Sequence, residues 1–196
     1  MGTYINRGNN AFRNIVSHEY IDKTSLIPLV NATINTESRY SCVTRCRRFG
    51  KSMAAKMLCA YYDKSCDSRE LFVGLKAEQD KSFDTFLNRF YVLYLDVTSF
   101  TARPELRKNI VRNIQNEIIY ELKKTFPDVE YDDNSDLMDV LSSIHQSTGE
   151  QFFFIIDEWD AMCREFPDRQ KMKGDPETIT PTILDEYVML LRRLFK

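Results

Sequence analysis

The chain has 196 residues, of which 43% are hydrophobic and 29% are charged. This composition is typical of a globular protein and excludes collagen-like, low-complexity and wholly disordered chains. The formal net charge of -2 argues against a protein that binds nucleic acid through its surface as a whole.

The first residues lack the apolar stretch of a secretory signal, and the longest apolar run, 152–156, is too short to cross a bilayer. The five cysteines form no CxxC pair, and the two histidines lie far from them in sequence. We therefore expect a cytoplasmic protein with reduced thiols, no zinc site and no membrane contact.

The first quarter of the chain carries weak signals. Residues 1–17 are polar and predict an irregular leader, and residues 20–24 (YIDKT) predict a short extended segment. Thr24 is predicted to cap a helix over 25–30. Residues 39–44 (RYSCVT) alternate in polarity and predict a strand.

The middle of the chain is more regular. Good helix formers predict a helix from Lys51 to Tyr62, and the apolar run 91–97 predicts a buried strand. Short helices are predicted around 68–71 and 83–90. Apolar residues four apart then predict a long helix over 104–126, which begins with a proline.

The last third continues the alternation. A helix is predicted over 135–145, a strand covered on both faces over 152–156, and a final helix over 183–195. Strands that alternate with helices indicate an α/β fold with a largely parallel sheet.

The first chemical motif lies between the strand predicted over 39–44 and the helix from Lys51. A phosphate-binding loop needs this arrangement, because loop N–H groups and the helix N-terminus face the anion. Here Lys51 would contact the β- and γ-phosphates and Ser52 would bind Mg²⁺. The pattern GxxxxGK[ST] asks for glycine at the position of Arg45, so the alternative is an ordinary helix start. The residues assigned to the nucleotide are Cys46, Arg47, Arg48, Phe49, Gly50, Lys51, Ser52 and Met53.

The second motif is the apolar run that ends in Asp157 and Glu158, a Walker B pattern. Asp157 would hold Mg²⁺ through water, and Glu158 would polarise the attacking water. The alternative is a buried strand that ends at a polar loop. Both motifs stand at the carboxyl edge of a predicted strand, where open α/β sheets bind ligands.

A basic cluster of Arg45, Arg47, Arg48 and Lys51 allows two interpretations. It neutralises the phosphates of a nucleotide, or it forms a nucleic-acid patch. The cluster is small and the chain is net acidic, so the nucleotide is favoured and nucleic acid is not expected to bind this chain alone.

Three segments, Tyr20–Thr24, Arg45–Ser52 (RCRRFGKS) and Phe154–Asp160 (FIIDEWD), together resemble the predicted AAA-ATPase-like family of bacteria and archaea. The resemblance covers nearly all of the chain. The family typically reads RPRRFGKS, so the missing first glycine is a family trait, whereas Cys46 replaces a proline. By looser analogy, the Tyr20–Thr24 segment lies near the adenine.

The resemblance implies a P-loop NTPase-like three-layer sandwich with a mostly parallel sheet, truncated before the sensor strand. It assigns residues 1–196 to the N-terminal portion of one AAA-ATPase-like domain. It also implies ATP and Mg²⁺ as cofactors, Ser52 and Asp157 as metal ligands, and Glu158 as the catalytic base. A protein partner or a missing C-terminal half would complete the sheet.

Three functions remain open from the sequence. The first is a Mg²⁺-dependent ATPase in which water attacks the γ-phosphate. The second is a non-hydrolysing remnant or interaction module, and the third is a nucleic-acid-binding module.

Overall fold

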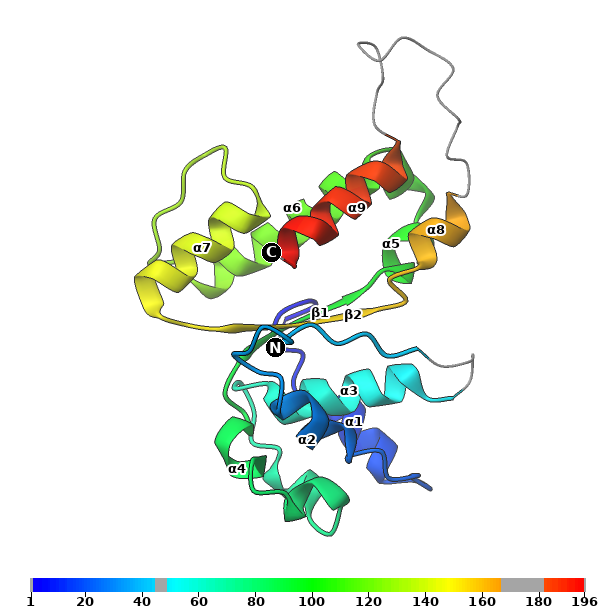
Figure 1. Cartoon of the computed structure of the whole chain (residues 1–196). Helices are drawn as coiled ribbons and strands as arrows, with labels where there is room; N and C mark the ends of the chain where they lie inside the picture. Colours follow the sequence, from blue (N-terminus) through cyan, green and yellow to red (C-terminus); the bar gives the residue numbers. More distant parts are fainter. Residues whose placement is uncertain (1, 45–48, 167–181, 196) are drawn as a thin grey trace. The chain divides into compact units, whose positions relative to one another are not determined.

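The computed structural model of the chain describes residues 2–44, 49–166 and 182–195, so the predictions for Cys46, Arg47 and Arg48 lie outside the described residues. The chain divides into two compact units (Figure 1). Unit 1 comprises Met1–Leu95 and Glu150–Asp157, and unit 2 comprises Asp96–Gly149 and Glu158–Lys196. Helices combine with a small parallel sheet, which is compatible with the predicted α/β class.

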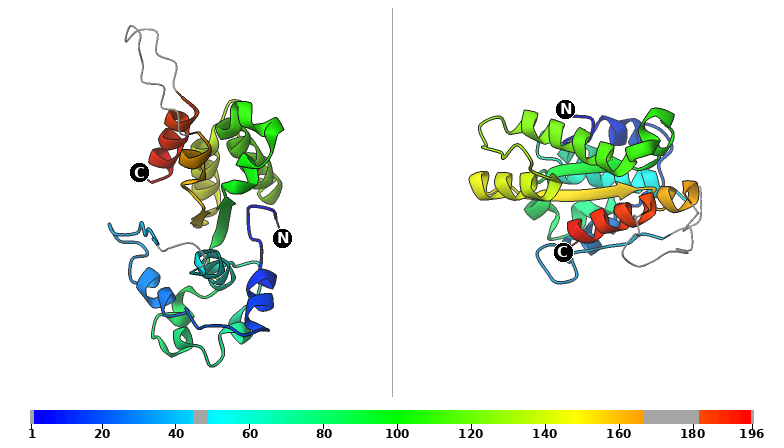
Figure 2. Two further views of the ribbon diagram at one scale, coloured as in Figure 1. Left: turned by 90° about the vertical axis from the view of Figure 1, so that its right-hand side faces the viewer. Right: turned by 90° about the horizontal axis from the view of Figure 1, so that it is seen from above.

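The sheet of the described chain has two neighbouring strands, β1 (Tyr91–Asp96) and β2 (Phe152–Asp157), which run side by side in Figures 1 and 2. Both strands were predicted from their apolar runs. The N-terminal segment covers the second edge of β1, where Asn6 N donates to Val92 O at 2.9 Å and Tyr94 N donates to Tyr4 O at 2.8 Å. In the described residues no strand lies against the second edge of β2.

The strand predicted over 39–44 is not formed, and the residues of this segment are exposed. Alternating polarity favours a strand only where a neighbouring strand pairs with its backbone and one face is buried. The described chain supplies neither of these to residues 39–44, so this prediction was wrong.

The irregular leader predicted over 1–17 is also wrong in part, because α1 (Asn10–Val16) is a helix. Phe12 is fully buried, and its ring stacks on Phe72 with the centroids 5.2 Å apart. This distant aromatic contact stabilises a helix that is too short to be stable by itself.

The helix predicted after Thr24 is present as α2 (Leu26–Asn31), but Thr24 does not cap it. The Thr24 hydroxyl instead donates to Asp22 Oδ1 at 2.7 Å and accepts from Ala77 N at 3.0 Å. Thr24 therefore stabilises the turn that precedes α2.

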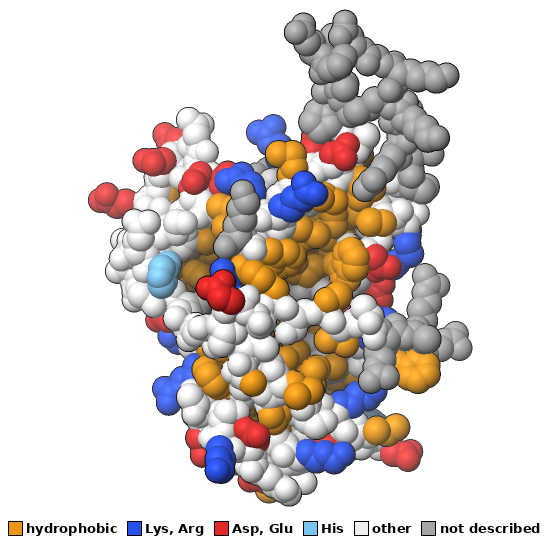
Figure 3. Space-filling model, viewed as in Figure 1, with side chains coloured by type: hydrophobic (Ala, Val, Ile, Leu, Met, Phe, Trp, Pro, Cys, Tyr) orange, Lys and Arg blue, Asp and Glu red, His pale blue; other side chains and the backbone are white. Residues whose placement is uncertain are grey.

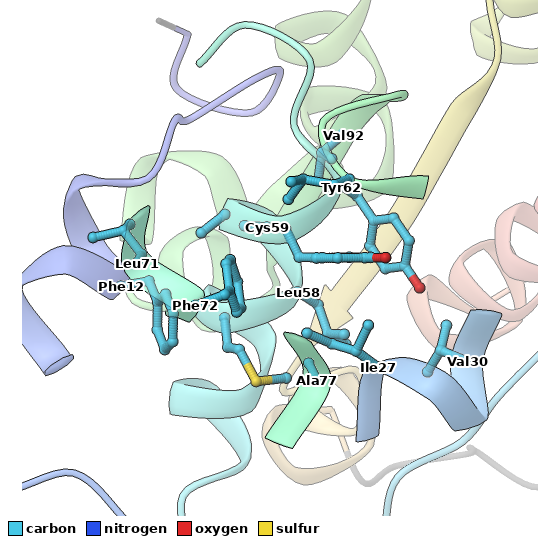
Figure 4. Packing of buried hydrophobic residues seen from close by; sticks show 14 of the residues in the cluster. Phe12, Ile27, Val30, Leu58, Cys59, Tyr62, Leu71, Phe72, Ala77 and Val92 are labelled. Atoms are coloured by element: carbon cyan, nitrogen blue, oxygen red, sulfur yellow. The ribbon is translucent and has the colours of Figure 1, made fainter. Parts of the chain in front are cut away.

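The predicted helix α3 (Lys51–Tyr62) has the expected bounds, and its second half forms the centre of the unit 1 core (Figure 4). Tyr62 stacks on Phe153 of β2 with ring centroids 3.9 Å apart. The remaining elements of unit 1 are short: the 3-10 helices η1 (Arg69–Phe72) and η2 (Lys76–Gln79), and α4 (Phe83–Phe86).

Unit 2 is helical. Its elements are α5 (Thr98–Thr101), the 3-10 helix η3 (Pro104–Asn109), α6 (Ile110–Thr125), α7 (Leu137–Thr148), α8 (Ala161–Glu165) and α9 (Ile183–Leu194). The predicted stripe of α6 is buried at Ile110, Ile114, Ile118 and Leu122, and α6 packs against α7 and α9. The helix predicted from Pro104 therefore starts as a 3-10 turn and continues as α6.

β2 is less buried than its continuous apolar run predicted, since Phe152, Phe153 and Phe154 are only half-buried. Hydrophobic side chains are visible within both units on the face drawn in Figure 3. Over the described chain as a whole, exposed large hydrophobic residues include Ile21, Leu29 and Val73 of unit 1 and Met189 of unit 2. Among the described helices, none combines the length and the apolar character that a membrane span requires.

Candidate functional site

The start of α3 has the backbone that the phosphate-loop pattern predicts at its glycine. Gly50 precedes the helix with φ 76°, a left-handed conformation that side chains other than glycine adopt only with strain. The backbone N–H of Ala54 makes the first bond of the helical ladder, to Gly50 O at 3.0 Å. The backbone N–H groups of the residues before Ala54 have no carbonyl acceptor within the helix. This end of α3 therefore favours an anion.

Besides Gly50, the structure describes four of the residues that were predicted to bind the nucleotide. Phe49 is exposed, whereas Lys51, Ser52 and Met53 are half-buried in the first turn of α3. Lys51 and Ser52 thus stand where the pattern requires an ammonium group and a hydroxyl.

The other predicted motif ends β2. Asp157 is a buried carboxylate, 8% exposed, and Tyr94 Oη on β1 donates to its Oδ2 at 3.0 Å. The guanidinium of Arg7 lies over the Tyr94 ring, 4.7 Å from the centroid. The hydrogen bond orients the Asp157 carboxylate in the way that outer-shell groups orient metal ligands.

Within unit 1 the start of α3 and the end of β2 at Asp157 lie at the same end. Figure 1 shows α3 beside β2, with the start of the helix and the end of the strand on the same side. From Phe153, which stacks on Tyr62, the strand advances about 13 Å to Asp157. The same distance along the helix is about nine residues, which reaches back from Tyr62 to its first turn.

Glu158 follows Asp157 with φ 52°, a left-handed conformation that a glutamate adopts only with strain. Arg164 of α8 donates to Glu158 Oε2 at 2.8 Å and also pairs with Asp160. These two contacts, with Asp160 the stronger, raise the pKa of the Arg164 guanidinium further. The candidate base is therefore held in an ion pair inside unit 2.

The turn over residues 20–24 contacts the start of α3. Lys23 Nζ donates to Phe49 O at 2.6 Å, and a Cβ at Gly50 would lie 3.0 Å from Lys23 Nζ. The position of the Tyr20–Thr24 segment relative to an adenine stays a prediction. Its contact with the residue before Gly50 was not predicted.

The described residues contain no group of three or more His, Cys, Asp or Glu side chains that could hold a metal ion. A Mg²⁺ site built from one carboxylate, one hydroxyl and the substrate's own phosphates needs no such group, since Mg²⁺ keeps several waters. Ser52 and the oriented carboxylate of Asp157 fit this donor set.

The sequence did not predict the contacts of two residues beside the candidate site: Tyr94, and Lys23, whose segment Tyr20–Thr24 was expected only to lie near the adenine. Each acts on a residue far along the chain, Lys23 on Phe49 and Tyr94 on Asp157. The tyrosine has no local signal, because its position in an apolar strand predicts packing. The lysine lies in a motif that the resemblance singled out, which was the available signal.

Comparison with known proteins adds one match. No curated protein and no solved structure shows significant similarity to the chain. A family model described as "Predicted AAA-ATPase" matches residues 7–192 and so spans both units. The chain therefore belongs to the AAA-ATPase-like family, whose description indicates a nucleotide-binding, ATPase-like protein.

Proposed function

We propose that the chain binds ATP with Mg²⁺ at the start of α3 and hydrolyses it. The observation that carries this proposal is the common location of Gly50, Lys51 and Ser52 with the end of β2. The family match over residues 7–192 supports treating both units as parts of one ATPase domain. We extend the proposal to a P-loop three-layer fold, of which β1, β2 and α3 are elements.

Each residue has a defined task in this reaction. The Lys51 ammonium binds the β- and γ-phosphates, and the N–H groups of the first helical turn add the favourable end of the helix dipole. Ser52 and Asp157 hold Mg²⁺, which would neutralise phosphate charge and fix the triphosphate. Tyr94 keeps the Asp157 carboxylate oriented.

Glu158 is the proposed general base. It accepts a proton from the water that attacks the γ-phosphate in line with the leaving oxygen. Arg164 donates to Glu158 Oε2 at 2.8 Å, so the attacking water would compete with the guanidinium for this carboxylate oxygen.

Isothermal titration calorimetry tests the binding step. Mg·ATP titrated into the chain is expected to bind saturably, and Lys51→Ala is expected to lose most of this affinity. Glu158→Gln is expected to bind Mg·ATP like the parent chain but to release no phosphate. Equal binding by Lys51→Ala and the parent would refute the phosphate-loop assignment.

A non-hydrolysing nucleotide-binding module is the second candidate, and one observation favours it. The described sheet has two strands, fewer than a complete doubly wound sheet has. This candidate predicts Mg·ATP binding that Lys51→Ala abolishes, with no phosphate release above that of Glu158→Gln. Turnover that Glu158→Gln removes would exclude it.

A further inference from the structure

Lys23 presents a positive charge at the start of α3 without a carboxylate partner among the described residues. Its Nζ makes one hydrogen bond, of 2.6 Å, to the carbonyl oxygen of Phe49. No acidic side chain of the described chain lies within salt-bridge distance of it. An ammonium group has three N–H donors, so this contact leaves donor capacity for a ligand.

The turn that carries Lys23 is fixed at several points. Asp22 Oδ1 accepts from Thr24 N at 2.8 Å, and Asp22 Oδ2 accepts from Lys76 N at 2.9 Å. Tyr20 Oη accepts from Lys23 N at 3.2 Å and donates to Met57 Sδ. These bonds anchor the backbone of the turn to η2 and to α3, and the bond to Phe49 O directs the Lys23 ammonium to the start of α3.

This position is unfavourable for a cation on its own. The N-terminus of a helix carries a partial positive charge, which opposes a cation placed beside it. Gly50 allows the close approach, because a Cβ there would lie 3.0 Å from Lys23 Nζ and 3.3 Å from Lys23 Cε. A ligand with several negative charges would be attracted both by the helix N-terminus and by the Lys23 ammonium.

We propose that Lys23 is a second cationic contact for the phosphate groups of the bound nucleotide, brought to the loop from outside it by the Tyr20–Thr24 turn. The inference rests on the proposed function and adds a binding residue to the same site. In this role Lys23 shares its donors between the Phe49 carbonyl and a phosphate oxygen. The turn is thus a phosphate-side element of the site.

Calorimetry with Mg·ATP tests this role in the full chain. Lys23→Gln removes the charge while keeping a polar side chain, and it is expected to weaken binding about tenfold, as loss of a charge-assisted hydrogen bond does. Lys56→Gln is the matched control, because Lys56 is an exposed lysine of α3 that lies beyond the first turn of this helix. It removes the same charge and is expected to stay within about twofold of the parent. Lys23→Arg is expected to retain most of the affinity.

The dependence of affinity on NaCl separates phosphate contact from loop support. If Lys23 contacts phosphate directly, the affinity of Lys23→Gln falls less steeply with NaCl concentration than that of the parent. If Lys23 only supports the loop, the affinity of Lys23→Gln is lower but depends on NaCl as steeply as that of the parent. A circular dichroism melt of each variant shows whether it folds. If Lys23→Gln does not fold, Lys23→Met and Lys23→Arg are measured in the same way, and failure of all three to fold would make the role structural and overturn the inference.

The remaining outcomes are also decisive. Binding by Lys23→Gln within twofold of the parent, an equal loss in Lys56→Gln, or an unchanged salt dependence would each overturn the inference. In these cases loss of binding in Lys51→Ala would leave the proposed function standing. Absence of Mg·ATP binding by the parent chain would instead refute the proposed function, and the inference with it.

Discussion

The hydroxyl of Tyr94 donates a hydrogen bond of 3.0 Å to Oδ2 of Asp157 and so joins the two strands of the sheet through their side chains. Tyr94 is 4% exposed and Asp157 is 8% exposed, so the bond is shielded from water. A carboxylate held in this way presents its charge in one orientation, which is what a Mg²⁺ ligand at the end of a strand requires.

Tyr94→Phe tests this relationship. The variant removes one oxygen and leaves the packing intact, and we expect affinity for Mg·ATP to fall about tenfold because the carboxylate loses its orientation. Affinity for ATP without Mg²⁺ is expected to stay unchanged. Titrations with and without Mg²⁺ measure both values. Tyr91→Phe removes a hydroxyl at the start of the same strand, and an equal loss there would contradict the assigned role of Tyr94.

Arg164→Ala is expected to raise the turnover number. The side chains of Arg164 and Glu158 are about one-third exposed, so their ion pair adds less than about 1 kcal/mol to the free energy of unfolding. Loss of the guanidinium frees Glu158 Oε2 to accept from the attacking water, and a rate increase of about threefold is expected with KM unchanged. Steady-state phosphate release measures both constants.

Arg107→Ala is the matched control for this experiment. It breaks the ion pair between Arg107 and Glu165, which also involves α8 but does not contact Glu158. Turnover like that of the parent is expected. A similar rise in both variants would mean that α8 as a whole, rather than the contact with Glu158, limits the rate.

Gly50→Ala is expected to lower both stability and affinity for Mg·ATP. The left-handed backbone at φ 76° costs an alanine about 1–2 kcal/mol, and the new Cβ would also push against Lys23 Nζ at 3.0 Å. Gly74→Ala is the control for the backbone effect alone. Gly74 also has a left-handed backbone, with φ 79°, but nothing lies within 4 Å of a Cβ at this position. Chemical unfolding is expected to show the larger loss for Gly50→Ala, and titration is expected to show a loss of affinity for that variant only.

Acid is expected to loosen the Tyr20–Thr24 turn. Partial burial opposes ionisation of Asp22, but hydrogen bonds from Thr24 and Lys76 outweigh it and hold its pKa below the ordinary value. A lowered pKa in the folded state means that the stabilisation is present above about pH 4 and is lost as the pH falls through the folded-state pKa. Urea unfolding between pH 7 and pH 3 measures this effect.

Asp22→Asn serves as the reference for the acid experiment. An amide cannot accept the Lys76 N–H at its nitrogen, so the variant is expected to be less stable than the parent at pH 7. Its stability is expected to vary less with pH below 4. Parallel pH profiles for the two chains would show that other carboxylates govern the acid response.

The elements with a strong local pattern were predicted well. Helix α3 has the bounds expected from its alanine, methionine and leucine content, and the strands β1 and β2 follow two apolar runs. The predicted stripe of α6 is buried as its four-residue spacing requires. Such patterns act over neighbouring turns or residues, so they can be recognised from the chain alone.

The wrong predictions concern segments whose structure depends on distant partners. The segment 39–44 alternates like a strand, but a strand forms only when another strand accepts its hydrogen bonds. Conversely, α1 looks irregular in sequence and is a helix because Phe12 packs on Phe72, sixty residues away. Neither outcome is encoded in the local sequence.

The candidate site divides in the same way. The proposed roles of Gly50, Lys51, Ser52 and Asp157 follow from residue types at motif spacings, since a phosphate and Mg²⁺ site would need those groups. The proposed roles of Lys23 and Tyr94 depend on contacts with distant residues. Lys23 contacts Phe49, 26 positions further along the chain, and Tyr94 contacts Asp157, 63 positions further along. Such contacts arise only when the folded backbone brings the two segments together, because the hydrogen bond itself extends less than about 3.5 Å.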